Sequence, residues 1–302
     1  MRIFFLILLA VLASFHTLSA RAAPAQAFAA EIPFRSCEGL ICIDVALDGA
    51  APRTLMLDTG NANSTLTADA ASALGWALTP AQRNGAAMPG IFLAGKRRVA
   101  FGAVEQSTPF FVFDRALLGE YKPPVDGSLS YGFFEDRILQ IDYPRHVLRI
   151  SNVISTPVPD RPGDSGTLRF VNFGDNGPQV LVGSPFMVNG KRVRAQIDTV
   201  FTGTMLVYNS ALDALGLSKQ GKPELFRYTS GGVNLMSTPA QDLGFGTRTL
   251  LRDGPIYFVG ESKNPVRQPG GLFEATVGNA LFERSVVTMD FHAMTLDVQP
   301  GN

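Results

Sequence analysis

Histidine and cysteine are scarce in this chain, whose 302 residues include three histidines and two cysteines. That supply is too small for a histidine-rich metal centre or a structural zinc site, so neither a metal nor a cofactor is expected. An excess of one charge is also lacking, because 26 basic residues balance 26 acidic ones. Without a basic surplus, nucleic acid is not an expected partner.

Long apolar runs are confined to one place, Ile3 to Phe15, which follows Met1-Arg2 and precedes small residues. This order is typical of a secretory signal peptide, which we assign to residues 1–22. The run is shorter than the roughly 20 residues that a membrane-spanning helix needs. We therefore expect a periplasmic or secreted protein with no stable membrane insertion after the signal is cleaved.

An oxidising compartment permits disulfides, and the two cysteines, Cys37 and Cys42, enclose four residues. A short hairpin with this spacing would place the two sulfurs opposite each other. The other interpretation is a pair of buried free thiols that behave as small hydrophobes. Neither interpretation makes the cysteines catalytic, because the sequence offers no nearby histidine and no Cys-x-x-Cys spacing.

The remaining sequence is rich in apolar residues, at 46%, and contains 30 glycines and 20 prolines. Its apolar runs are short, rich in β-branched and aromatic residues and bounded by glycine or proline, which favours a mainly β protein. Two segments also resemble each other. The run from Leu55 to Gly60 (LMLDTG) and the run from Ala195 to Val200 (AQIDTV) each precede a short helical pattern.

A second pair of segments strengthens this internal repeat. Residues 133–150 align without gaps on residues 281–298, with four identities and six exchanges between large apolar residues. We infer a duplication with an N-terminal lobe at 23–154, a linker rich in proline and glycine at 155–166, and a C-terminal lobe at 167–302. Because one chain supplies both halves, a monomer is expected.

Two Asp-Thr turns at matching places in a duplicated chain would meet across a pseudo-twofold axis. Two carboxyls held close together cannot both ionise cheaply, so Asp58 and Asp198 would share one proton. One would then act as a base toward a bound water and the other as an acid toward a peptide carbonyl. Thr59 and Thr199 would brace the two turns, and Gly60 would permit close approach.

These motifs resemble those of the pepsin and retropepsin superfamily of aspartic peptidases. The two Asp-Thr turns resemble its catalytic loops, and residues 126–129 and 277–282 resemble the segments that pass beside them. The resemblance implies two pseudo-symmetric closed β-barrel lobes with a short helix in each, and Asp58 and Asp198 as the catalytic pair. It also implies a substrate-binding flap with its tip near Met88, Pro89 and Gly90.

Three departures from that pattern keep two functions open. Val200 stands where the family has glycine, Asn61 and Phe201 replace a small or hydroxylated residue after each triplet, and Ser130 replaces a glycine. The first function is an exported aspartic endopeptidase acting on peptides or unfolded proteins. The alternative is a catalytically degenerate relative that binds a peptide or protein partner in the cleft between the lobes.

Overall fold

The computed structural model describes residues 28–83, 85–117, 121–151, 165–172, 179–228, 231–239, 242–260 and 269–301. The predicted signal peptide lies outside these ranges. Within them the chain is mainly β and has only short helices, which confirms the predicted fold class. None of the described helices has both the length and the apolarity needed for a membrane span.

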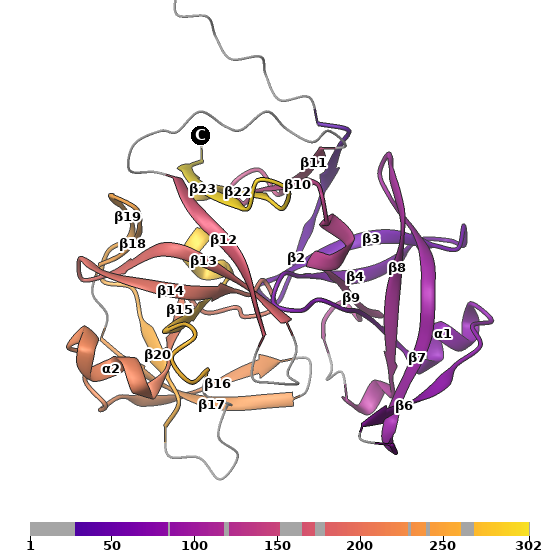
Figure 1. Cartoon of the computed structure of the whole chain (residues 1–302), viewed down its shortest axis with the longest axis horizontal. Helices are drawn as coiled ribbons and strands as arrows, with labels where there is room; N and C mark the ends of the chain where they lie inside the picture. The colour runs from indigo at the N-terminus through magenta and orange to yellow at the C-terminus, as the bar shows by residue number, and fades with distance from the viewer. Residues whose placement is uncertain are drawn as a thin grey trace, which may run out of the picture.

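The first lobe is a barrel that mixes antiparallel and parallel strands, and one of these strands ends at Asp58 (Figure 1). Its elements are β2 (Arg35–Cys37), β3 (Leu40–Leu47), β4 (Arg53–Asp58), β5 (Ser64–Thr67), α1 (Ala68–Ala73), β6 (Thr79–Arg83), β7 (Ala86–Phe101), β8 (Val104–Phe113), η1 (Arg115–Leu117), β9 (Gly127–Ser130) and η2 (Tyr131–Phe134). The hydrogen-bonded order β3-β4-β9-β5-β8-β7 returns to its start, because β7 also pairs with β3. The first barrel is therefore closed.

The second lobe repeats this order with different lengths. Its elements are β13 (Gln179–Val188), β14 (Lys191–Ile197), β15 (Met205–Val207), α2 (Asn209–Leu215), β16 (Lys222–Tyr228), β17 (Gly231–Thr238), β18 (Leu243–Phe245), β19 (Arg248–Leu251), β20 (Ile256–Phe258), β21 (Ala275–Val277) and α3 (Asn279–Phe282). The order is β13-β14-β21-β15-β20-β17, and β18 pairs with β13. Two strands, β17 and β18, thus occupy the place that the single long strand β7 fills in the first lobe.

Six antiparallel strands bridge the two lobes (Figure 1), and they form one end of a 15-stranded sheet that continues through β13 into the second lobe. In order they are β1 (Ala30–Pro33), β11 (Val147–Ser151), β10 (Ile138–Asp142), β22 (Ser285–Asp290), β23 (Thr295–Pro300) and β12 (Ser165–Asn172). Of the predicted linker, Ser165 and Gly166 are described, and they begin β12. The rest of the linker lies outside the described residues.

The centre of this sheet carries the pseudo-twofold relation between the lobes. In the repeat alignment Gln140 corresponds to Thr288, and in the sheet these two residues pair with each other. The Gln140 side chain also donates a hydrogen bond to the Thr288 hydroxyl at 3.0 Å. A residue that faces its own repeat counterpart marks an isologous contact. The axis of the duplication therefore passes between β10 and β22.

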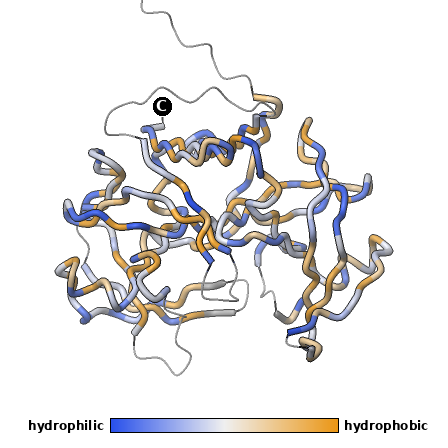
Figure 2. Tube along the Cα trace, viewed as in Figure 1, coloured by the Kyte–Doolittle hydropathy of each residue, from blue (hydrophilic) through white to orange (hydrophobic). Residues whose placement is uncertain are grey.

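Alternating burial explains why the short apolar runs form strands. Along β8, Val104, Thr108, Phe110 and Val112 are buried and the intervening positions face outward. Figure 2 shows the same mixture of hydrophobic and hydrophilic positions along the strands of both lobes. A period of two is the pattern of a half-buried strand. The inward positions of both lobes pack into one large hydrophobic core.

The first hairpin is closed by a disulfide between Cys37 and Cys42, which confirms the bonded interpretation of the two cysteines. Its turn consists of Glu38 and Gly39, both with positive φ, at 52° and 86°. Two residues of positive φ form the turn that matches the twist of an antiparallel hairpin. Both cysteines are buried, so the disulfide lies inside the first lobe.

Candidate active site

Each aspartate is held at the end of a strand beside a second strand that passes it in parallel. Asp58 ends β4 and stands opposite Ser130 at the end of β9. Asp198 follows β14, and its backbone N–H donates to the Val277 carbonyl at the end of β21, at 3.0 Å. Strands β9 and β21 also pair with β5 and β15, so each anchors the entry and the exit of one aspartate loop.

The two loops are joined by a reciprocal set of hydrogen bonds between Thr59 and Thr199, which are both buried. The backbone N–H of Thr59 donates to the Thr199 hydroxyl at 3.0 Å, and the N–H of Thr199 donates to the Thr59 hydroxyl at 3.2 Å. The hydroxyls in turn donate across the axis, from Thr59 to the Ile197 carbonyl at 3.0 Å and from Thr199 to the Leu57 carbonyl at 2.7 Å. The loops are therefore fixed to each other as well as to their own lobes.

This bracing brings the second carboxyl against the first loop. A Cβ atom built on Gly60 would lie 2.6 Å from Asp198 Oδ1 and 2.8 Å from its Oδ2. Such distances are shorter than any normal contact, so only glycine leaves room for the Asp198 carboxyl at this point. In the first loop the Gly60 N–H donates to Asp58 Oδ1 at 3.1 Å. The structure thus places Asp58, Gly60 and Asp198 in one site.

The two carboxyls have different hydrogen-bond partners. Asp58 accepts the Gly60 N–H on one oxygen and the Ser128 hydroxyl, at 3.3 Å, on the other. Asp198 accepts the Val200 N–H at 2.9 Å. Ser128 belongs to the parallel strand β9 and is fully buried. It supplies a hydroxyl to Asp58 although Asn61, which follows the first triplet, has none.

Burial dominates the protonation of this pair. The pKa of Asp58 is raised far above its ordinary value, first by burial and then by the charge of Asp198, against the lowering effect of the Gly60 N–H and the Ser128 hydroxyl. Burial also raises the pKa of Asp198, against the N–H groups of Val200 and Phe201. At neutral pH the two carboxyls therefore share a proton.

The residues that depart from the family pattern are accommodated in three ways. Val200 does not adopt a positive φ and is buried, with 4% of its surface exposed. Phe201 is buried in an aromatic cluster with Phe226 and Tyr257, at ring-centroid distances of 5.4 Å and 6.0 Å. Ser130 is buried and donates to the Ala62 carbonyl at 2.9 Å. Each of these side chains thus has defined partners.

The first-lobe hairpin that corresponds to the predicted flap is formed by β6 and β7. Arg83 pairs with Ala86, and Gly85, with a φ of 81°, lies in the turn before Ala86. Met88, Pro89 and Gly90, which were expected near the tip, lie in β7 shortly after this turn. Their part in binding a substrate stays a prediction.

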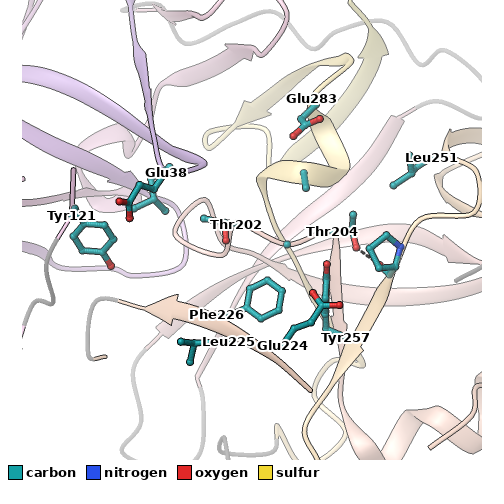
Figure 3. A pocket seen from close by; sticks show the side chains of 14 residues that line it. Glu38, Tyr121, Thr202, Thr204, Glu224, Leu225, Phe226, Leu251, Tyr257 and Glu283 are labelled. Atoms are coloured by element: carbon teal, nitrogen blue, oxygen red, sulfur yellow. Dashed lines mark hydrogen bonds between the residues drawn. The ribbon is translucent and has the colours of Figure 1, made fainter. Parts of the chain in front are cut away.

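A cavity of about 610 Å³ opens beside the second loop, where the two lobes meet (Figure 3). Thr202 of the second loop lines it together with Phe226 and Tyr257, whose rings lie 4.4 Å apart. Glu38 and Tyr121 line it from the first lobe. The two aspartates are not among its lining residues, so it is a side pocket and not the dyad itself.

Asn279 lies in the segment 277–282, and the sequence alone did not reveal its contacts. Its side-chain amide donates to the Thr199 carbonyl at 2.7 Å and to the Gly39 carbonyl at 2.9 Å, and its oxygen accepts the Tyr143 hydroxyl at 3.0 Å. It thereby links the second loop to the first lobe. The described residues contain no group of three side chains that could hold a metal ion.

Neither a protein-family model nor a curated protein matches this sequence. Solved structures do match it. They include basic 7S globulin from soybean, at 11% identity and a TM-score of 0.47 over 89% of this chain and 94% of the other. Conglutin gamma from lupine seeds matches at 11% identity and a TM-score of 0.48 over 89% and 94%. An aspartic proteinase from Irpex lacteus matches at 12% identity and a TM-score of 0.48 over 90% and 97%. At these identities and scores, the matches assign no activity and no residue role to this chain.

Proposed function

We propose that this protein is an exported aspartic endopeptidase that hydrolyses peptide bonds with a water molecule activated between Asp58 and Asp198. One observation carries the proposal: two buried carboxyls from opposite lobes are held together by the reciprocal bonds of Thr59 and Thr199. A turn with a purely structural role has no need of a second buried acid beside it, because burying two carboxyls together costs free energy.

The chemistry follows from the proton that the two buried carboxyls share. The ionised Asp198 takes a proton from the water, and the water oxygen attacks the peptide carbonyl carbon. The protonated Asp58 donates its proton to the developing oxyanion. When the tetrahedral intermediate collapses, the C–N bond breaks, the proton on Asp198 passes to the leaving nitrogen, and a proton from the intermediate returns to Asp58. The cycle needs no metal ion and forms no covalent bond between the enzyme and the substrate.

The expected substrate is an extended peptide or an unfolded protein segment, held by strand-like hydrogen bonds and by pockets for alternate side chains. The cavity of Figure 3 offers such a pocket, because aromatic rings from β16 and β20 form one wall. Its polar rim includes Glu38 and Glu224 from the two lobes. A side chain with an apolar stem would therefore find contacts there with both halves of the protein.

The test is cleavage of a denatured protein substrate by the purified chain without residues 1–22. Asp58→Asn and Asp198→Asn should each lower kcat/KM by at least about 10² to 10⁴-fold, the usual contribution of a general acid or base. A statine-type peptide, whose hydroxyl imitates the tetrahedral intermediate, should inhibit the unmodified protein. Cleavage that persists in both variants would refute the assignment of the dyad.

The degenerate alternative makes a different prediction in the same assay. If the protein holds the statine-type peptide but shows no turnover at any pH, the cleft binds a peptide without cleaving it. The assignment as an endopeptidase would then be replaced by that of a peptide-binding protein.

A further inference from the structure

Val200, the residue that breaks the second triplet, enters a hydrophobic socket that belongs entirely to the first lobe. It is 4% exposed and forms a separate buried cluster, outside the large core, with six first-lobe residues. The socket residues are Cys37, Leu40, Cys42, Met56, Tyr121 and Val125. A valine from one lobe thus fills a space in the other, and the disulfide forms part of the wall.

The corresponding position in the first triplet is used differently. Gly60 faces the Asp198 carboxyl and leaves no room for a side chain. Val200 carries its side chain into the socket, and its backbone remains in an ordinary φ region. The third residue therefore has a different role in each triplet. Gly60 leaves space for the carboxyl of the opposite lobe, and the apolar side chain of Val200 anchors its loop.

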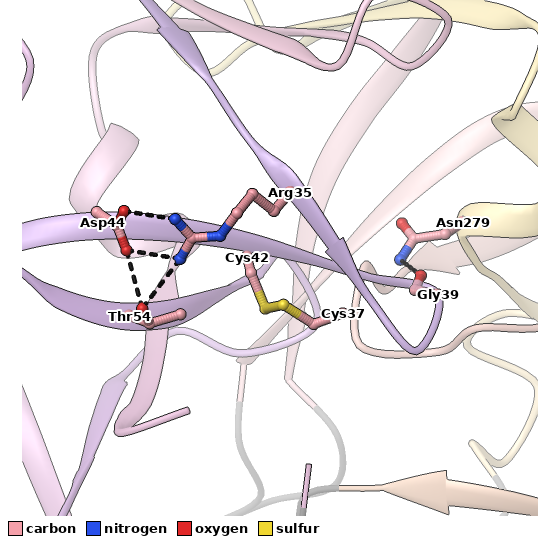
Figure 4. Close-up of a disulfide and its surroundings, with 7 residues drawn as sticks. All are labelled: Arg35, Cys37, Gly39, Cys42, Asp44, Thr54 and Asn279. Carbon is pink, nitrogen blue, oxygen red and sulfur yellow. Dashed lines mark hydrogen bonds and ion pairs between the residues drawn. A yellow bond between two sulfur atoms is a disulfide. The ribbon is translucent and has the colours of Figure 1, made fainter. Parts of the chain in front are cut away.

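Polar contacts tie the same wall to the second loop. The Gly39 carbonyl, in the turn between the two cysteines, accepts a hydrogen bond from the Asn279 amide (Figure 4). The same amide donates to the Thr199 carbonyl. A Cβ added to Gly39 would lie 3.2 Å from Thr202 Cγ2, so the turn also touches the loop beyond Val200. The hairpin therefore contacts the second loop at Val200 and Thr202, and Asn279 links it to Thr199.

We propose that Val200 is a positioning residue, which seats the second aspartate loop in the socket closed by Cys37–Cys42 and so holds its own N–H against Asp198. The inference rests on the proposed function, because it assigns Asp198 to the dyad. The Val200 N–H donates to Asp198 Oδ1 at 2.9 Å, so any movement of residue 200 moves a hydrogen-bond donor of that carboxyl. The valine at position 200 thus helps to hold the hydrogen bond to Asp198 in place.

Loss of this anchor should change how Asp198 titrates. The titratable groups near the pair are Tyr208, whose pKa the charge of Asp198 raises, and Tyr131, whose pKa the charge of Asp58 raises. Asp58 is itself affected by the charge of Asp198. The Val200 N–H favours the ionised form of Asp198, so a looser N–H raises the pKa of that carboxyl. The acid limb of the kcat profile should then move to higher pH.

The experiment compares Val200→Ala with Val188→Ala, a truncation of a fully buried valine in β13 that belongs to the main core. We expect Val200→Ala to lower kcat by about tenfold or more with a smaller change in KM, because the loss is one of geometry. The acid limb should shift upward in this variant alone, and Val200→Ile should restore most of the activity. An unchanged kcat and pH profile in Val200→Ala, or the same shift in Val188→Ala, would overturn the proposal.

A second arm does not depend on turnover. The pKa of the Asp198 carboxyl, followed by carbon NMR of the labelled protein, should rise in Val200→Ala and in the double variant Cys37→Ala/Cys42→Ala, but not in Val188→Ala. If the unmodified protein fails to cleave any substrate, the proposed function fails, and this titration still decides the role of Val200. If Val200→Ala does not fold, the cysteine variant decides it. An Asp198 pKa that is unaffected in the variants that fold would refute the proposal.

Discussion

The third residue of each Asp-Thr triplet decides how the two loops approach each other. Gly60 lies under the Asp198 carboxyl, where an added Cβ would be 2.5 Å from its Cγ. Its φ is not positive, so the requirement for glycine comes from space and not from backbone conformation. Glycine is therefore required at position 60 because the Asp198 carboxyl approaches it closely. Adding one methyl group, as in Gly60→Ala, tests this explanation.

Gly60→Ala should displace the Asp198 carboxyl and lower kcat/KM by about 10²-fold, the scale of a misplacement near 1 Å. Gly75→Ala is the matched control. Gly75 follows α1 with φ of 68°, and an added Cβ would meet nothing within 4 Å. The control should cost roughly 1 kcal/mol of stability through backbone strain and leave kcat/KM unchanged. Equal losses of activity in the two variants would contradict this explanation.

At the scale of elements, the two aspartate loops are held by bonds that cross from one lobe to the other. The Thr199 hydroxyl is buried, donates to the Leu57 carbonyl at 2.7 Å and accepts the Thr59 N–H at 3.0 Å. These bonds join the end of β4 to the loop after β14. Breaking them should therefore weaken folding and separate the carboxyls in the same variant.

Thr199→Val preserves the shape of the side chain and removes both hydrogen bonds. Each buried group left without a partner costs about 1–3 kcal/mol, so the free energy of unfolding should fall by at least that amount. Urea denaturation measures the loss. Thr199→Ser retains the hydroxyl, gives up one methyl group and should lose only about 1 kcal/mol. If the serine variant were as unstable as the valine variant, the hydroxyl bonds would not be responsible.

The sequence predicted those elements whose signal is local or repeated. The two Asp-Thr turns and the matched segments at 133–150 and 281–298 indicated the duplication, and β10 and β22 now pair across its axis. The short helical pattern expected after each turn is present as α1 and α2, which follow β5 and β15.

The features that the sequence did not predict depend on contacts between segments far apart in the chain. Ser128 reaches Asp58 because β9 runs parallel to β4, and Asn279 reaches Gly39 because the lobes meet there. Val200 suggested a lost function when considered alone. Its socket forms from residues 37–125, which no pattern within the second lobe could reveal.

At the scale of the whole molecule, one chain builds both halves of a symmetric site and then makes them unequal. The sheet at the axis pairs Gln140 with its own counterpart Thr288, so the framework is isologous. The carboxyls are not equivalent, since Asp58 accepts a hydrogen bond from the Ser128 hydroxyl and Asp198 accepts one from the Val200 N–H. Inequality within a symmetric frame is what gives one acid the role of donor and the other that of base.

The shared burial of the dyad should also appear in global stability. An aspartate whose pKa is higher in the folded than in the unfolded chain, where it is about 4, binds more protons in the folded state above that pH. Its contribution to stability is therefore complete below the unfolded pKa and is lost as the pH rises through the folded pKa. Asp58→Asn removes this loss, because asparagine does not titrate.

Thermal unfolding should be measured from about pH 5 to about pH 8. The difference in Tm, variant minus unmodified protein, should increase for Asp58→Asn as the pH rises. Asp213→Asn is the control, because that carboxylate is mostly exposed and pairs with Lys219 at the surface. An exposed pair contributes little, so its Tm difference should remain small and nearly constant across the range. A constant difference for Asp58→Asn as well would mean that the carboxyl is solvated in the folded chain, and the shared proton on which the proposed chemistry depends would be absent.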